Sequence, residues 1–193
     1  PLPFRSAGWK RYDAATKEGN VFVTDKSEKI VRIINGTTAH IIIIDDFQYI
    51  MANEFMRRVL DKESGNAAFA KYNEIARSVW DIINAAAQAG DVKRVYMLSH
   101  TQNSEDGNVK IKTIGKLLDE KITIEGMFTM VMRTHVNQGE YLFGTHNSGH
   151  DTVKTPLGMF ADDYIPNDLK AVDAAITDFY GIDAIVNPAT NAA

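Results

Sequence analysis

The sequence contains no cysteine among its 193 residues, and its longest apolar run covers only residues 40–44. The absence of cysteine excludes a disulfide scaffold, thiol catalysis and any zinc site built from thiolates. The apolar run is far shorter than the ~20 residues that a helix needs to cross a bilayer, and no signal peptide is recognisable, so we expect no membrane association. The net charge of −4 provides no general attraction to nucleic acid, which would therefore need a local basic patch.

The length and the hydrophobic share of 45% are those of one globular domain, spanning residues 1–193. The last residues, 188–193, are small and polar, and we expect a flexible tail over residues 183–193. The first residue is Pro1 rather than methionine. From this we expect the sequence to begin inside a longer product.

Hydrophobic periodicity predicts an alternation of helices and strands. Helices are predicted over residues 28–34, 47–62, 66–89, 114–118 and 168–180. Strands are predicted over residues 21–24, 39–44, 94–99, 127–135 and 140–145. The four isoleucines Ile41–Ile44 show no polar alternation, which is typical of a strand buried on both faces. The order predicts an α/β fold with a mainly parallel sheet and an antiparallel hairpin extension.

The first candidate site follows the predicted strand over residues 39–44. Asp45 and Asp46 end this strand, and ligands of open α/β sheets bind outside the carboxyl ends of strands. Four apolar residues followed by acids form the Walker B pattern, in which the first acid holds Mg²⁺ and the second orients or deprotonates the attacking water. Gln48, which closes this stretch, is a candidate cofactor-binding residue. The alternative is a solvated strand end whose aspartate caps the following helix.

A second polar tip follows the predicted strand over residues 94–99. His100 and Thr101 come directly after it. P-loop ATPases place a polar residue between the Walker B acid and the γ-phosphate, where a histidine or threonine can donate a hydrogen bond to a phosphate oxygen. His100 and Thr101 are therefore candidate catalytic residues. The alternative is an ordinary polar turn.

The sequence contains no G-x-x-x-x-G-K-[ST] motif, whose backbone amides and lysine hold phosphates. The nearest stretch, residues 144–151, has two glycines but His for Lys and Asp for Ser/Thr, so we interpret it as a turn. Three histidines around the predicted hairpin, His135, His146 and His150, together with Asp151 suggest a metal site, but strand alternation would scatter them over two faces. We therefore prefer the turn.

Basic side chains gather in the second half of the chain despite the acidic total. Such a group can contact the phosphates of nucleic acid or of a neighbouring subunit, and the alternative is a solvated face. The group comprises Lys110, Lys112, Lys116, Lys121 and Arg133.

Several segments together resemble the phage-encoded P-loop ATP-binding proteins of the AAA/RecA-like type, which are related to RecA-like single-strand annealing proteins. The matching segments are residues 1–5, 41–51, 96–101, 110–118, 124–128, 154–160 and 167–170. They spread over most of the chain, and those after residue 110 are fairly specific. The departure is the missing Walker A motif, which in the family lies upstream of the Leu-Pro-Phe segment.

The resemblance implies a RecA-like P-loop NTPase core that lacks its N-terminal strand and P-loop. Asp45 would be the Walker B magnesium residue, Asp46 the water-activating acid, and His100 with Thr101 the sensor. Lys112 and Lys116 would face DNA or a neighbouring subunit's nucleotide, with Arg133 in the same basic group. A further candidate for reaching across such an interface to the nucleotide is Lys154.

The function that the resemblance implies is Mg²⁺-dependent ATP hydrolysis in phage DNA recombination or replication. ATP and Mg²⁺ would be the cofactors, single-stranded DNA and further copies in a ring or filament the partners, and the host bacterial cytoplasm the location. We expect the 193 residues to bind ATP poorly, since they lack the P-loop. The alternative is a nucleotide-free RecA-like module that binds DNA or a protein. A small-molecule kinase is disfavoured because no acceptor pocket or lid is apparent.

Overall fold

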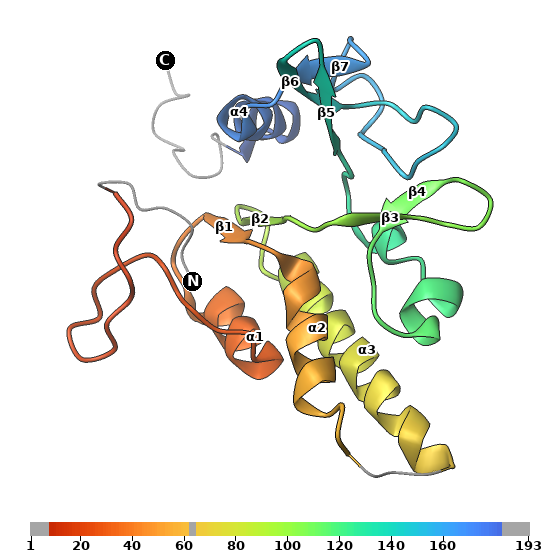
Figure 1. Ribbon diagram of the computed structural model, residues 1–193. Coiled ribbons are helices and arrows are strands. Elements are labelled where there is room, and N and C mark those ends of the chain that lie inside the picture. Colours follow the sequence, from red (N-terminus) through yellow and green to blue (C-terminus); the bar gives the residue numbers. More distant parts are fainter. Residues whose placement is uncertain (1–7, 62–64, 183–193) are drawn as a thin grey trace.

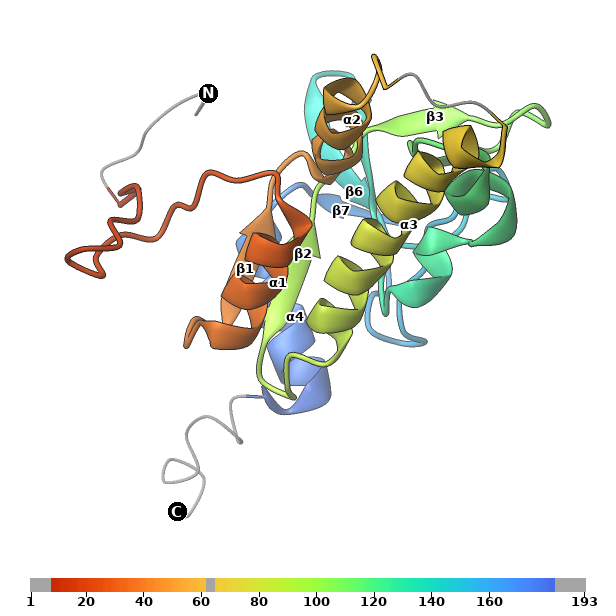
Figure 2. The same ribbon diagram turned by 90° about the horizontal axis from the view of Figure 1, so that it is seen from below.

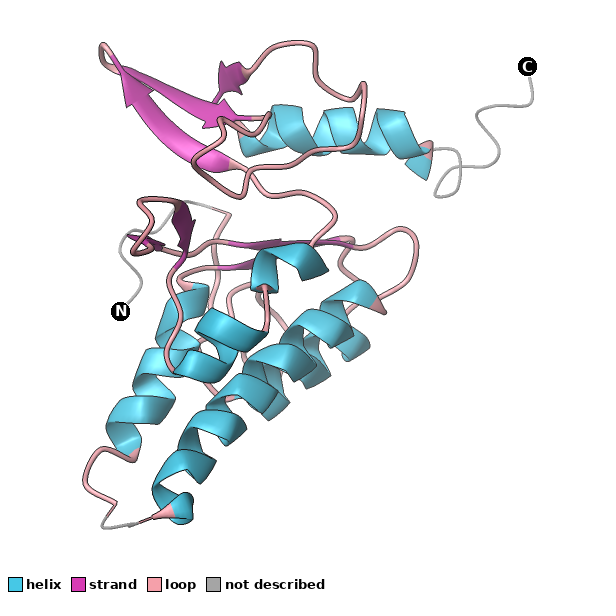
Figure 3. Ribbon diagram, turned by 90° about the vertical axis from the view of Figure 1, so that its right-hand side faces the viewer, coloured by secondary structure: helices cyan, strands magenta, loops and turns pink. Residues whose placement is uncertain are grey.

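The computed structural model describes residues 8–61 and 65–182, and these form a mixed α/β structure in layers (Figures 1 and 3). Four helices contribute: α1 (Ser27–Gly36), α2 (Phe47–Arg57), α3 (Asn66–Ala87) and α4 (Leu169–Tyr180). The strands are β1 (Ile41–Ile44), β2 (Arg94–Met97), β3 (Thr101–Asn103), β4 (Val109–Ile111), β5 (Arg133–Asn137), β6 (Glu140–Gly144) and β7 (Tyr164–Pro166). The expected tail lies outside the described residues, as does the segment 1–5.

The central layer is a parallel pair formed by β1 and β2, with Ile41 opposite Arg94 and Ile44 opposite Met97. The expected parallel pairing of these two strands is confirmed. The other pairings are antiparallel: β3 pairs with β4, and β6 lies between β5 and β7. The described strands thus form one parallel pair and two antiparallel sheets rather than one extended sheet.

Helices α1, α2 and α3 cover one face of the parallel pair, and α4 with the β5–β6–β7 sheet lies on the other side (Figures 2 and 3). In α3, Ile75, Val79, Ile82 and Ile83 repeat at helical spacing, so they form one buried stripe. Together with residues of α1 and α2 they make the larger core, against which Ile42 and Ile44 pack.

Helix α4 begins and ends where its sequence predicts. The Asp168 carboxylate accepts hydrogen bonds from the backbone N–H groups of Lys170 and Ala171, which caps the free amides of the first turn. Gly181 follows the helix with φ +64°, a left-handed conformation that glycine adopts without steric cost. Val172 and Ile176 of α4 form a smaller core against which Tyr96 packs.

The prediction that the isoleucine strand is buried on both faces is wrong. Ile41 is 46% exposed and Ile43 is 50% exposed, whereas Ile42 and Ile44 are largely covered. Strand alternation sends Ile42 and Ile44 toward the helical core, while α4 packs on β2 rather than on β1. All four isoleucines therefore favour the extended conformation, but only the two on one face contact the core.

Matched alanine substitutions in β1 test this one-sided burial. We expect Ile42→Ala to lower the free energy of unfolding by about 2 kcal/mol or more, because it removes apolar surface from a packed core. Ile43→Ala is expected to cost roughly 0.5–1 kcal/mol, since its side chain is half exposed and loses mainly strand propensity. Urea unfolding of both variants measures the difference, and equal costs would contradict the one-sided packing.

Other differences from the predictions concern short elements. Residues 21–24 form no strand but a single bridge at Val21, and the helix predicted to reach residue 62 ends at Arg57. In place of the helix predicted over residues 114–118, the chain forms a π-helical turn, Leu117–Lys121, which is followed by a 3-10 turn, Ile124–Met127. The predicted hairpin is confirmed, with a two-residue turn at Gln138 and Gly139.

Candidate functional site

The candidate site begins at the sharp turn between β1 and α2. Only Asp45 and Asp46 separate the last strand residue from Phe47, the first residue of the helix. Asp46 has φ +53° and ψ +55°, a left-handed conformation that is uncommon outside glycine and asparagine or aspartate. Such strained residues cluster at functional sites, where the surrounding structure holds them in place.

Two backbone hydrogen bonds fix this turn to the end of β2. The Leu98 N–H donates to the Ile44 carbonyl at 3.0 Å, and the Phe47 N–H donates to the Leu98 carbonyl at 2.8 Å. Because these bonds continue the parallel ladder beyond the strands, the residues after β1 and after β2 must lie side by side. The geometry therefore brings Asp46 next to His100, as the sequence predicts for parallel strand ends.

The Asp46 carboxylate and the His100 imidazole are in contact. Asp46 Oδ1 lies 3.3 Å from His100 Nε2, and the two side chains are 52% and 59% exposed. Asp46 occupies the N-cap position of α2, but its side chain accepts no capping hydrogen bond. The sequence-based alternative, in which this aspartate caps the helix, is therefore not what the structure shows.

Tyr49, from the first turn of α2, completes the group. Its ring meets the His100 ring edge-on, with the centroids 6.1 Å apart and the planes at 85°. Asp45 is exposed, and within the described residues its carboxylate makes no hydrogen bond or ion pair. One carboxylate is thus held by a histidine, and its neighbour remains available to a ligand.

Two buried polar atoms beside the same turn have no partner in the described chain: Gln48 Oε1 and Ser99 Oγ. Gln48 as a whole is only 8% exposed. Gln48 follows Phe47 and Ser99 follows Leu98, so the two flank the hydrogen bond that joins α2 to the end of β2. Buried polar groups are nearly always hydrogen-bonded, so a water or a ligand group is the natural partner for these atoms.

The donor set of the turn fits Mg²⁺ better than it fits ATP. Magnesium is usually held by one or two carboxylates together with waters and substrate phosphates, which matches Asp45 and Asp46. No group of three or more metal-ligating side chains occurs in the part of the chain that the structure describes, so a metal cage built from protein side chains is not shown. A triphosphate would need backbone amides and a lysine that the 193-residue sequence does not offer as a P-loop.

Thr101 and Lys112 lie beside this turn, whereas Lys154 contacts other residues. Thr101 opens β3, and the Lys112 N–H donates to the His100 carbonyl at 2.9 Å. Lys154 pairs through its backbone with Val131, and its ammonium donates to the Gly126 carbonyl at 3.4 Å. No described contact connects Lys154 to the turn.

The predicted basic group is partly neutralised. Lys110 Nζ lies 2.7 Å from the Asp119 carboxylate, which raises the pKa of Lys110, and Lys116 lies 3.7 Å from Glu120. Within the described ranges, Lys112 and Lys121 form no ion pair. Positive charge that is free to meet a phosphate therefore remains mainly at Lys112 and Lys121.

Arg133 comes from a different element of the chain from the lysines of this group. It lies in β5, and its charge is one of several causes that together hold the pKa of Asp151 below its usual range, against the raising effect of burial. The loop over residues 144–151 is closed by its own side chains, with Asn147 Oδ1 accepting from the Gly149 N–H and the Ser148 hydroxyl donating to Asp151. This agrees with its interpretation as a turn rather than a phosphate-binding loop.

Sequence reasoning missed Tyr49 and Ser99 as members of the site. The only signal for them was their position, three residues after Asp46 in a helix and one residue before His100. The left-handed conformation of Asp46 had no sequence signal beyond the tolerance of aspartate for that region.

Comparisons with known proteins add no relative. No family model matches the chain, no curated protein matches it and no solved structure matches its fold. None of the helices in the described ranges, 8–61 and 65–182, is both long and apolar enough to cross a bilayer.

Proposed function

We propose that the turn at Asp45 and Asp46, together with the end of β2, is the Mg²⁺- and phosphate-handling edge of a RecA-like ATPase domain that acts on single-stranded DNA. The single observation that carries this proposal is the meeting of two parallel strand ends, with Asp46 Oδ1 3.3 Å from His100 Nε2 and with Asp45 unengaged among the described residues. The resemblance to the phage-encoded ATP-binding proteins points in the same direction.

Each residue of the site has a separate role in this proposal. Asp45 holds the metal, usually through water, and a bound Mg²⁺ supplies charge that offsets the negative phosphate oxygens. Asp46 orients the attacking water or accepts its proton, and the contact with His100 fixes the position of the carboxylate. His100 and Thr101 are the hydrogen-bond donors that face the phosphate, and Gln48 contributes a buried amide beside them.

The proposal requires a phosphate-binding loop that is not among the 193 residues. In this proposal, assembly with further copies brings Lys112 and Lys116 to DNA or to a neighbour's nucleotide. Arg133 and Lys154 are more distant candidates, because Arg133 lies in β5 and the Lys154 ammonium donates to the Gly126 carbonyl.

A nucleotide-free module that binds DNA or protein is the second candidate function. It is favoured by the lack of a P-loop in the 193 residues and by the charges of Lys112 and Lys121, which form no ion pair in the part of the chain that the structure describes. The two candidates differ in their need for Asp45.

DNA-stimulated hydrolysis of ATP, measured on the full-length gene product, tests the choice. Hydrolysis that depends on Mg²⁺ and is lost on replacement of Asp45 supports the ATPase. Binding of single-stranded DNA without any hydrolysis supports the module.

A further inference from the structure

An arm formed by residues 8–26 projects from the molecule beside α1 (Figures 1 and 2). The arm has a defined conformation without being a regular hairpin. The Tyr12 N–H donates to the Val21 carbonyl and the Val21 N–H to the Lys10 carbonyl, at 2.8 and 2.9 Å. Gly19, with φ +107°, permits this closure, because a Cβ there would lie 2.5 Å from the Arg11 carbonyl oxygen.

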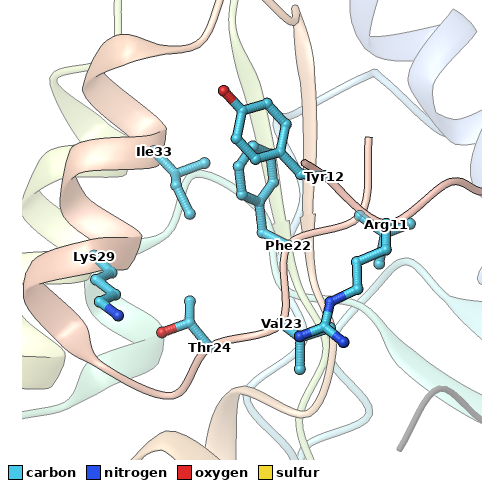
Figure 4. A pocket seen from close by; sticks show the side chains of 8 residues that line it. Arg11, Tyr12, Phe22, Val23, Thr24, Lys29 and Ile33 are labelled. Carbon is cyan, nitrogen blue, oxygen red and sulfur yellow. The ribbon is translucent and has the colours of Figure 1, made fainter. Parts of the chain in front are cut away.

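Residues of the arm and of α1 line a pocket of about 190 Å³ that is open to solvent. Figure 4 shows Tyr12 and Phe22 from the arm lying against each other, across from Ile33 and Lys29 of α1. The two rings are stacked, with centroids 4.4 Å apart and an interplanar angle of 25°, and Phe22 is 43% exposed. The exposed Phe22 ring, backed by the partly buried Tyr12 ring, offers a flat apolar surface on which a ligand ring can stack.

The charge of the pocket has one sign. Arg11 and Lys29 line it and no carboxylate does. Two acids of the arm are engaged elsewhere: Glu18 pairs with Lys10, and Asp25 pairs with Arg57 at 2.7 Å. Within the described residues, neither Arg11 nor Lys29 forms an ion pair, so both are available to an anion.

We propose that this pocket binds one base of single-stranded DNA, with the base stacked on the aromatic pair and the flanking phosphates on Arg11 and Lys29. Stacking surfaces framed by cations are how proteins hold single strands without reading their sequence. The pocket is smaller than the 300–1,000 Å³ typical of sites for whole small molecules, so it suits a base whose sugar and phosphates stay outside it. This inference rests on the proposed action on DNA but not on the phosphate chemistry at Asp45.

The test is the affinity of the full chain for a fluorescent thymidine 20-mer at two salt concentrations. We expect Phe22→Leu to weaken binding about 10-fold, within the range measured for loss of one stacked base. Phe22→Tyr keeps a ring and is expected to bind like the unaltered protein. Arg11→Gln and Lys29→Gln should each reduce the slope of log affinity against log salt by about 0.7. Tyr141→Leu, an exposed aromatic in β6, is the matched control and should change nothing.

A 20-mer in which every nucleotide lacks its base separates the contribution of stacking to affinity from the contribution of phosphate contacts. The difference between the unaltered protein and Phe22→Leu should vanish on this strand, while the effects of Arg11→Gln and Lys29→Gln persist. Unchanged affinity of Phe22→Leu for the thymidine strand, or no binding of that strand at low salt by the unaltered protein, overturns the inference.

The outcome is distinguishable from failure of the proposed ATPase. Metal binding at Asp45 is measured by a separate titration with Mn²⁺. Its affinity is expected to be the same in Phe22→Leu as in the unaltered protein. Loss of the metal site with retained Phe22-dependent DNA binding would overturn the proposed function alone. The reverse pattern would overturn only the role of the pocket.

Discussion

Asp45→Asn is expected to lower the rate of DNA-stimulated ATP hydrolysis by roughly 100-fold or more in the protein that carries a phosphate-binding loop. Removing one pre-positioned charged group from a phosphoryl-transfer site typically costs factors of about 10²–10³. Asparagine has nearly the same shape as aspartate, and the Asp45 carboxylate makes no hydrogen bond or ion pair within the described structure, so the fold should be preserved. Steady-state ATP turnover at saturating Mg²⁺ measures the effect.

Asp91→Asn is the matched control for this substitution. Asp91 is exposed and precedes β2, so it lies at the opposite end of the strand from His100. Turnover in Asp91→Asn should equal that of the unaltered protein. Normal turnover in Asp45→Asn would remove the carboxylate from the proposed site.

Asp173→Ala is expected to lower the free energy of unfolding by about 2–4 kcal/mol. The Asp173 carboxylate accepts two hydrogen bonds from the Arg94 guanidinium, at 2.7 and 2.8 Å, and one from the Tyr96 hydroxyl at 2.5 Å. The arginine and aspartate side chains are only 14% and 16% exposed. Removal of the carboxylate therefore leaves a largely buried cation without its partner, the costly way to break an ion pair. Urea unfolding measures the loss.

Asp178→Ala controls for the alanine substitution itself. Asp178 lies on the same helix, α4, but is exposed. A cost within about 0.5 kcal/mol is expected there. Equal costs at the two positions would show that the Arg94–Asp173 pair does not attach α4 to β2.

The same pair gives stability a defined dependence on pH. Hydrogen bonding from Arg94 is the main cause that holds the pKa of Asp173 below its ordinary value. A carboxyl whose pKa is lowered by folding stabilises the folded state above its unfolded pKa of about 3.9, and that contribution is lost as the pH falls through the lower folded value. The stability difference between the unaltered protein and Asp173→Ala should therefore shrink below pH 4 and stay constant between pH 5 and 7.

Much of the fold follows from local sequence. The apolar spacing of Ile75, Val79 and Ile82 predicts α3, and Asp168 and Gly181 mark the ends of α4, because periodicity and capping act within a few residues. Strands β3, β4 and β7 were not predicted, since three residues carry too little alternation to stand out from a loop. The exposure of Ile43 depends on where α4 packs, and the residues near Ile43 in the sequence carry no information about that.

The candidate site divides in the same way. That Asp46 and His100 meet could be predicted, because both follow adjacent parallel strands whose carboxyl ends share one edge. The left-handed backbone of Asp46 and the Tyr49 ring against His100 could not, because no pattern of residue types in this stretch specifies either of them. Lys154 was grouped with the site by resemblance alone, and its backbone pairing with Val131 shows why position in the sequence did not locate it.

Binding of a divalent metal at Asp45 tests the central claim most directly, and it requires neither a P-loop nor DNA. Titration of the 193-residue chain with Mn²⁺, a paramagnetic substitute for Mg²⁺, should broaden the backbone amide signals of residues 45–49 and 98–101 before others. Addition of Mg²⁺ should reverse the broadening, Asp45→Asn should prevent it and Asp91→Asn should not. Broadening that spares these residues, or that persists in Asp45→Asn, would contradict the account.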